Sequence, residues 1–208
     1  FSAVDIVAPD SYPLAFNKPI TNDTRNLPAY KKAQKNGWPQ VWQIVQVCQW
    51  KPELQDRLPT EKQIRTQCFL GLADNLKGLA FYSYYNYPEK RPEQWRAISG
   101  AVNSLHTFLP DVLASEKVIT DGLSDNKDVR YILHQPKGKD YLLLLAVNGK
   151  ENFTDELPRK EPVPVSLGKV SFRLPGVKIR KIEALDEDAN GNLSLGKIRE
   201  LKTSGDRF

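Results

Sequence analysis

The feature that most constrains the fold is a change of pattern near Ser115. Before this point, short apolar runs alternate three times with segments that carry helical signals. Alternating strands and helices predict a parallel sheet, because each helix returns the chain to the end at which the previous strand began. After this point, apolar runs are separated only by turns rich in Gly, Pro and Asn, which is typical of antiparallel strands.

Each part of the chain is predicted to hold a defined set of elements. In the first part we expect strands at residues 4–8, 41–48 and 79–85, and helices at residues 28–35, 61–77 and 92–113. In the second part we expect strands at residues 129–133, 141–147, 165–174, 177–185 and 193–201, which predict an antiparallel β-sandwich. The predicted domains are therefore residues 1–115 and residues 116–208.

The middle helix of the first part carries the clearest start signal. Thr60 is predicted to be its N-cap, and Gln63 three residues later completes a capping box. From Ile64 to Leu76 an apolar residue recurs at every fourth position, which predicts one apolar face along the helix.

Composition excludes several classes of protein. Lys and Arg total 30 and Asp and Glu total 25 in 208 residues, so 30 − 25 gives a net charge of +5. The basic residues are spread along the chain, and we therefore predict no nucleic-acid partner. No apolar run approaches the roughly 18 residues that indicate a membrane span.

Cysteine, histidine and glycine patterns exclude further kinds of site. The two cysteines, Cys48 and Cys68, are too few for a disulfide framework, and they are expected to be bonded to each other or buried as free thiols. The two histidines, His106 and His134, argue against a multi-histidine metal site. The chain has neither a G-x-G-x-x-G loop nor a P-loop, and we expect no cofactor.

The first part is too short to form a complete parallel barrel. A complete (β/α)8 barrel needs roughly 250 residues, and three strand–helix units cannot close one. An open sheet of three parallel strands leaves its edges unpaired. The first part is therefore either a small open α/β layer or the last part of a barrel whose earlier strands lie outside this sequence.

Several sequence pieces, in one order, resemble a known family. They are DIV leading to DSYP at residues 5–13, VWQIVQ leading to QW at residues 41–50, LPTE with IR at residues 58–65, and LKGLAFYSY at residues 76–84. Together they resemble the sixth, seventh and eighth βα units of a (β/α)8 glycoside-hydrolase-like protein. A β-sandwich often follows in such proteins, and YLLLLAVN at residues 141–148 is similar to one of its strands.

Polar and aromatic residues follow each of the three predicted strands. In barrels the active site lies at the carboxyl ends of the strands. The candidate substrate-binding residues there are Tyr12, Gln46, Gln49, Trp50, Tyr82 and Tyr84. Aromatic rings stack on the apolar face of a sugar, and amides bind its hydroxyl groups, so these residue types indicate a carbohydrate partner. The alternative interpretation is that some of them pack in the core or stabilise turns.

Hydrolysis of a glycosidic bond normally requires two carboxyl groups. The resemblance implies a nucleophilic glutamate at the end of the seventh strand, where this chain has Gln46, and an amide cannot take that role. The candidate catalytic residues are therefore Asp10 and Glu53, with Glu89 as a weaker third.

Three hypotheses about function follow. The first is a glycoside hydrolase, and the second is a non-catalytic protein of the same architecture that binds a polysaccharide or oligosaccharide. The third is a structural or adaptor domain without a glycan ligand. The amide at Gln46 favours the second hypothesis over the first.

Overall fold

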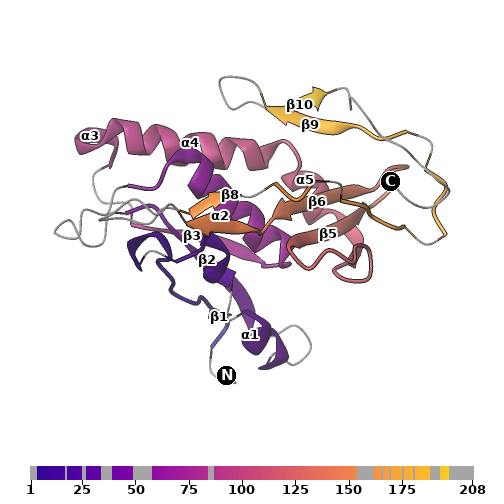
Figure 1. The fold of residues 1–208 in the computed structure, drawn as a ribbon, viewed down its shortest axis with the longest axis horizontal. Helices are drawn as coiled ribbons and strands as arrows, with labels where there is room; N and C mark the ends of the chain where they lie inside the picture. Colours follow the sequence, from indigo (N-terminus) through magenta and orange to yellow (C-terminus); the bar gives the residue numbers. More distant parts are fainter. Residues whose placement is uncertain are drawn as a thin grey trace.

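The computed structural model describes most of the chain. The described residues are 4–16, 18–24, 27–33, 39–48, 58–83, 87–153, 162–164, 166–168, 170–174, 176–179, 181–187 and 193–196. Figure 1 shows the long helix α4 along one side of the molecule, with the β9–β10 pair beyond it.

The first part of the chain forms a small parallel sheet. Its strands are β1 (Ile6–Val7), β2 (Gln40–Gln46) and β3 (Gly78–Tyr82), in the order β1-β2-β3. Helix α1 (Leu27–Ala33) connects β1 to β2, and helix α2 (Glu61–Ala73) connects β2 to β3. The short 3-10 helices η1 (Leu14–Phe16) and η2 (Ile20–Thr24) precede α1. The predicted strand–helix alternation and parallel pairing are confirmed for these elements.

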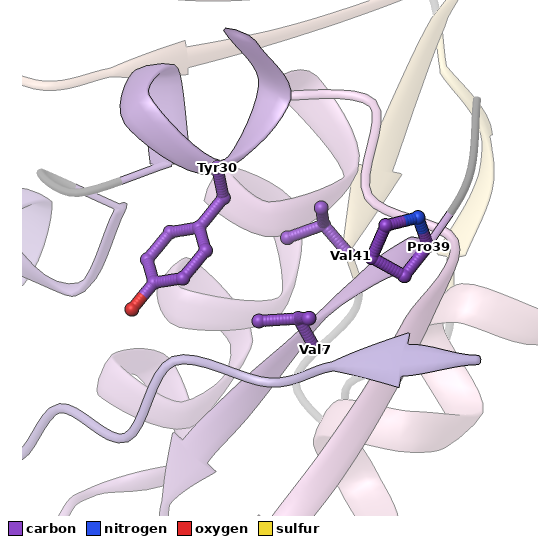
Figure 2. Close-up of a pocket in the computed structure, with 4 residues that line it drawn as sticks. All are labelled: Val7, Tyr30, Pro39 and Val41. Carbon is purple, nitrogen blue, oxygen red and sulfur yellow. The ribbon is translucent and has the colours of Figure 1, made fainter. Parts of the chain in front are cut away.

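Helix α1 covers the start of the parallel sheet. Tyr30 of α1 lies over Val7 and Val41, which are paired in register on β1 and β2, and Pro39 borders the same group (Figure 2). The four side chains close on one another and leave no room for a water molecule. This group is therefore packing rather than a ligand site.

The predicted start of α2 is confirmed in detail. The Thr60 backbone N–H donates to Gln63 Oε1 at 2.9 Å, and the Gln63 N–H donates to Thr60 Oγ1 at 3.3 Å. This reciprocal pair satisfies two donors that a helix start would otherwise leave unpaired. The apolar face is buried, since Ile64, Cys68 and Leu72 all lie in the core.

The long helix predicted at residues 92–113 is divided in two. Helix α3 (Tyr87–Lys90) precedes α4 (Pro92–His106), and α5 (Leu109–Leu113) follows after a turn that buries Phe108. Pro110 explains the interruption, because it has no N–H to donate to the carbonyl of His106 and is tolerated only in the first turn of a new helix. The Phe108 ring lies 5.3 Å from that of Phe69 on α2, between centroids.

The second part of the chain forms antiparallel sheets. Strands β4 (Ser115–Ile119), β5 (Val129–Pro136) and β6 (Leu143–Asn148) form the larger one, in the order β4-β5-β6. Two further pairs join β7 (Glu151–Phe153) to β8 (Pro162–Pro164) and β9 (Ala184–Glu187) to β10 (Leu193–Gly196). Strand β4, which has no fully buried residue, was not predicted.

One apolar cluster joins the two larger sheets. Helix α2 packs against β2, α4, β5 and β6. The buried members of this shared core are Val45, Val47, Ile64, Cys68, Leu72, Ile98, Ala101, Leu105, Phe108, Ile132 and Leu145. The shared core therefore includes residues from both sides of Ser115.

The predicted partial (β/α)8 barrel is wrong. The described residues contain one parallel sheet of three strands, and β1 has only two residues. Closure into a barrel requires strands that are tilted and staggered around a complete ring. Here the antiparallel strands β5 and β6 pack against α2 instead, and the two sheets share one core through that helix.

The predicted β-sandwich is also wrong. A sandwich needs a second sheet facing β4-β5-β6, but the described residues 166–168, 170–174 and 176–179 form no extended strand. Their apolar side chains still cover this sheet, and the Phe172 ring meets the Tyr131 ring edge-on with 5.7 Å between centroids. Pro175 in the sequence has no N–H for a strand ladder, whereas apolar packing needs none.

A buried histidine links β4 to β5. His134 is 3% exposed, and its Nδ1 lies 3.1 Å from Ser115 Oγ. Burial lowers the pKa of His134, and the nearby Lys77 ammonium lowers it further. His134 is therefore neutral in the folded protein near neutral pH.

We expect the buried imidazole to make the fold sensitive to mild acid. The unfolded chain binds a proton at His134 near a pKa of about 6.5, whereas the folded chain binds it only at lower pH. The free energy of unfolding should therefore decrease as the pH is lowered past about 6.5. This group contributes at most ~1.4 kcal/mol per pH unit to the decrease. NMR titration of the His134 imidazole measures its pKa directly, in the folded chain and in the chain unfolded by urea. A His134 pKa in the folded chain at or above the value in urea would contradict the prediction.

Candidate functional site

The carboxyl ends of β1, β2 and β3 bring four of the predicted residues to one edge of the parallel sheet. Asp10 and Tyr12 follow β1, Gln46 ends β2, and Tyr82 ends β3. Gln46 and Tyr82 are partners in the strand register, and the next backbone N–H, that of Val47, donates to the Tyr82 carbonyl at 2.9 Å. Parallel strands place these ends together because all three run in the same direction.

Tyr12, which follows β1, is in contact with Tyr82, which ends β3. The Tyr12 and Tyr82 ring centroids lie 5.5 Å apart, with the planes tilted by 51°. Tyr12 is 9% exposed and Tyr82 is 41% exposed. The Tyr12 ring is therefore buried beneath the contact, and the Tyr82 ring is partly open to solvent. Such tilted aromatic contacts contribute about 0.5–1.5 kcal/mol beyond the area they bury.

Asp10 belongs to the same group. Burial raises the pKa of Tyr12 well above its usual range, and a hydrogen bond with the Asp10 carboxylate and the charge of that carboxylate raise it further. Tyr12 therefore remains protonated and donates its hydroxyl hydrogen to Asp10. The Asp10 side chain itself is exposed. We call Asp10, Tyr12 and Tyr82 the tyrosine–aspartate group.

Gln46 lies beneath this edge, fully buried, and both ends of its amide are engaged by the backbone. Its Oε1 accepts from the Leu14 N–H at 3.1 Å, and its Nε2 donates to the Cys48 carbonyl at 3.3 Å. These bonds satisfy backbone groups where the chain leaves β2 and enters η1. The structure thus gives Gln46 a role in holding the edge together.

Buried glutamines from two helices extend this network, and sequence reasoning missed them. The Gln67 side chain on α2 accepts from the Gln46 N–H at 2.9 Å and donates to the Gln46 carbonyl at 3.3 Å. Gln94 on α4 donates to the carbonyls of Val47 and Pro59 at 3.1 and 3.2 Å. A detectable signal was the position of Gln67, directly before Cys68 on the apolar side of α2.

Of the candidates still to be placed, the structure describes only Glu89. Gln49, Trp50, Glu53 and Tyr84 lie outside the described residues. Glu89 is described, and it is exposed on α3. Cys48 and Cys68 are both buried and are not joined in a disulfide.

The described part of the chain contains neither a metal-ligand group nor a membrane-spanning helix. No group of three or more His, Cys, Asp or Glu side chains is arranged there to hold a metal ion. Among the same residues, no helix has both the length and the apolar character needed to cross a membrane. Comparison of the chain with protein-family models, curated proteins and solved structures found no match.

Proposed function

We propose that the protein binds a carbohydrate at the carboxyl edge of its parallel sheet, without hydrolysing it. The observation that carries this proposal is the tyrosine–aspartate group, in which an exposed aromatic ring lies beside a buried one that is hydrogen-bonded to a carboxylate. An open aromatic face and a nearby hydrogen-bond acceptor are the two features that recognise a pyranose ring.

Each member of the group has a separate part in binding. The exposed Tyr82 ring stacks on the apolar face of the sugar, and Tyr12 supports that ring from below. Asp10 accepts hydrogen bonds from sugar hydroxyl groups. An ionised carboxylate offers about four acceptor positions, so the bond from Tyr12 leaves acceptor capacity for a ligand.

Binding is favoured over hydrolysis because, among the described residues, the group contains a single carboxylate. Glycoside hydrolysis normally uses two, about 5 Å apart in retaining enzymes and about 6.5–9.5 Å apart in inverting ones. The side chain at the end of β2 is the amide of Gln46, and its two polar atoms are bonded to backbone groups. It therefore serves neither as nucleophile nor as general acid.

Isothermal calorimetry with xylohexaose, cellohexaose and maltohexaose tests the proposal. We expect at least one of them to bind, and Tyr82→Ala to weaken that binding at least tenfold, about 1.4 kcal/mol, because the stacking face is lost. Tyr82→Phe keeps the ring and should retain most of the affinity. Tyr141→Ala removes a tyrosine of similar exposure on the connection between β5 and β6 and should leave the hexasaccharide affinity unchanged.

Three outcomes would overturn the proposal in different ways. If no hexasaccharide binds, carbohydrate recognition is wrong. If Tyr82→Ala binds as tightly as the original protein, the site is wrong. If reducing ends are released from the bound sugar, and Asp10→Asn abolishes the release, the protein is a hydrolase.

A further inference from the structure

A second site lies on the larger antiparallel sheet, on the face turned away from α2. A cleft of about 320 Å³ opens there between β4, β5, the start of β6 and the C-terminal segment that crosses the sheet. Its lining residues are Lys117, Ile119, Leu123, Leu133, Gln135, Lys139, Asp140, Tyr141, Leu142, Leu174 and Val177. The volume is within the range of small-molecule sites, about 300–1,000 Å³.

The inner part of the cleft is apolar. Leu123, Leu133 and Leu174 are each at most 6% exposed and belong to the second apolar cluster of the protein. Ile119 and Val177 are half-buried against the same cluster. The cleft is therefore the place where this cluster is left open at one end.

The outer part of the cleft is polar and carries two lysines. In the register of β4 and β5, Ile119 is opposite Leu133, and Lys117 is opposite Gln135. Alternate residues of a strand share one face, so the lining changes from apolar to polar over two residues of each strand. Lys139, on the connection from β5 to β6, adds a second ammonium group to the polar end.

The charges at this end favour an anion. Lys117 and Lys139 form no ion pair with the described residues, whereas the neighbouring Lys137 lies 3.9 Å from the Glu116 carboxylate. Among the described lining residues Asp140 is the one carboxylate, so two of their positive charges face one negative charge. The Tyr141 hydroxyl is held by Asp111 at 2.7 Å, which fixes the ring as a side wall.

We propose that this cleft binds a small amphipathic anion, with an apolar body against Leu123, Leu133 and Leu174 and a carboxylate or sulfonate between Lys117 and Lys139. Apolar contact supplies most of the affinity, because solvent-exposed lysines contribute little in water. The two ammonium groups set the orientation and select the anion over a neutral molecule of the same shape. The site shares no residue with the tyrosine–aspartate group, so either proposal can fail alone.

Fluorescence titration of the full chain with 8-anilinonaphthalene-1-sulfonate, followed by displacement with decanoate, tests the inference. We expect saturable binding, displacement by decanoate, and at least fivefold weaker displacement by the neutral decanol. The double variant Lys117→Gln/Lys139→Gln should lose at least fivefold in decanoate affinity and keep its decanol affinity. Lys137→Gln removes the same charge outside the cleft and should match the original protein.

NMR locates the bound decanoate, and circular dichroism checks that each variant is folded. We expect shifts of backbone amide signals centred on Ile119, Leu123 and Leu133. The inference is overturned if decanoate does not displace the probe, if decanol competes equally well, or if the shifts lie elsewhere. It is also overturned if the folded double variant binds decanoate as the original protein does.

Discussion

Replacing Gln46 with Met should destabilise the protein by about 2–6 kcal/mol. Methionine has similar length and fills the same space, but it cannot bond the Leu14 N–H or the Cys48 carbonyl. Each backbone group left unpaired in the core costs about 1–3 kcal/mol, and the substitution leaves two. A small domain has only about 5–15 kcal/mol of stability in total, so this single change should remove a large share of it.

Urea denaturation measures the effect, with Gln135→Met as the matched control. Gln135 is an exposed glutamine on β5, and its replacement should change the free energy of unfolding by less than about 0.5 kcal/mol. Equal stabilities of the Gln46→Met and Gln135→Met variants would show that the buried amide does not hold the sheet edge.

Replacing Ile64 with Ala should lower the free energy of unfolding by about 2–5 kcal/mol. Ile64 is completely buried on α2, in the core shared by the parallel and antiparallel sheets. Removing three carbons there loses apolar burial and leaves a cavity, because the two sheets packed on α2 cannot both move in to fill it.

The same denaturation experiment on Leu113→Ala provides the comparison. Leu113 is 77% exposed at the end of α5, so its truncation should change the free energy of unfolding by less than about 0.5 kcal/mol. If Ile64→Ala unfolds in two separate transitions, one for each sheet, the two sheets do not share a cooperative core.

The local elements of the parallel sheet were largely predictable, because short-range patterns specify them. The capping box at Thr60 and Gln63 is a contact between residues three apart, and it formed as expected. The three parallel strands lie where short apolar runs occur, with β-branched residues in β1 and β2 and aromatic residues at the end of β3. The break at Phe108 was missed although Pro110 signalled it, because the apolar periodicity before and after it suggested one helix.

The candidate site was predictable only in part. Parallel strands put Asp10, Tyr12 and Tyr82 at one edge, and their positions at or after the carboxyl ends of the predicted strands located them there. These positions do not say which side chains point inward. Gln46 is buried because α2 brings Gln67 to its backbone and the segment after Tyr12 brings the Leu14 N–H to its amide.

The amino-acid sequence by itself determined the order of the three parallel strands, the helices α1 and α2 between them, and the start of α2, since these depend on residues a few positions apart. Only the tertiary structure decided what covers α2, namely β5 and β6, and therefore that the strands form neither a barrel nor a sandwich. It also decided the contact between Tyr12 and Tyr82, which are 70 positions apart. Such choices depend on which apolar surfaces meet, and many pairings of the same amphipathic elements bury similar areas.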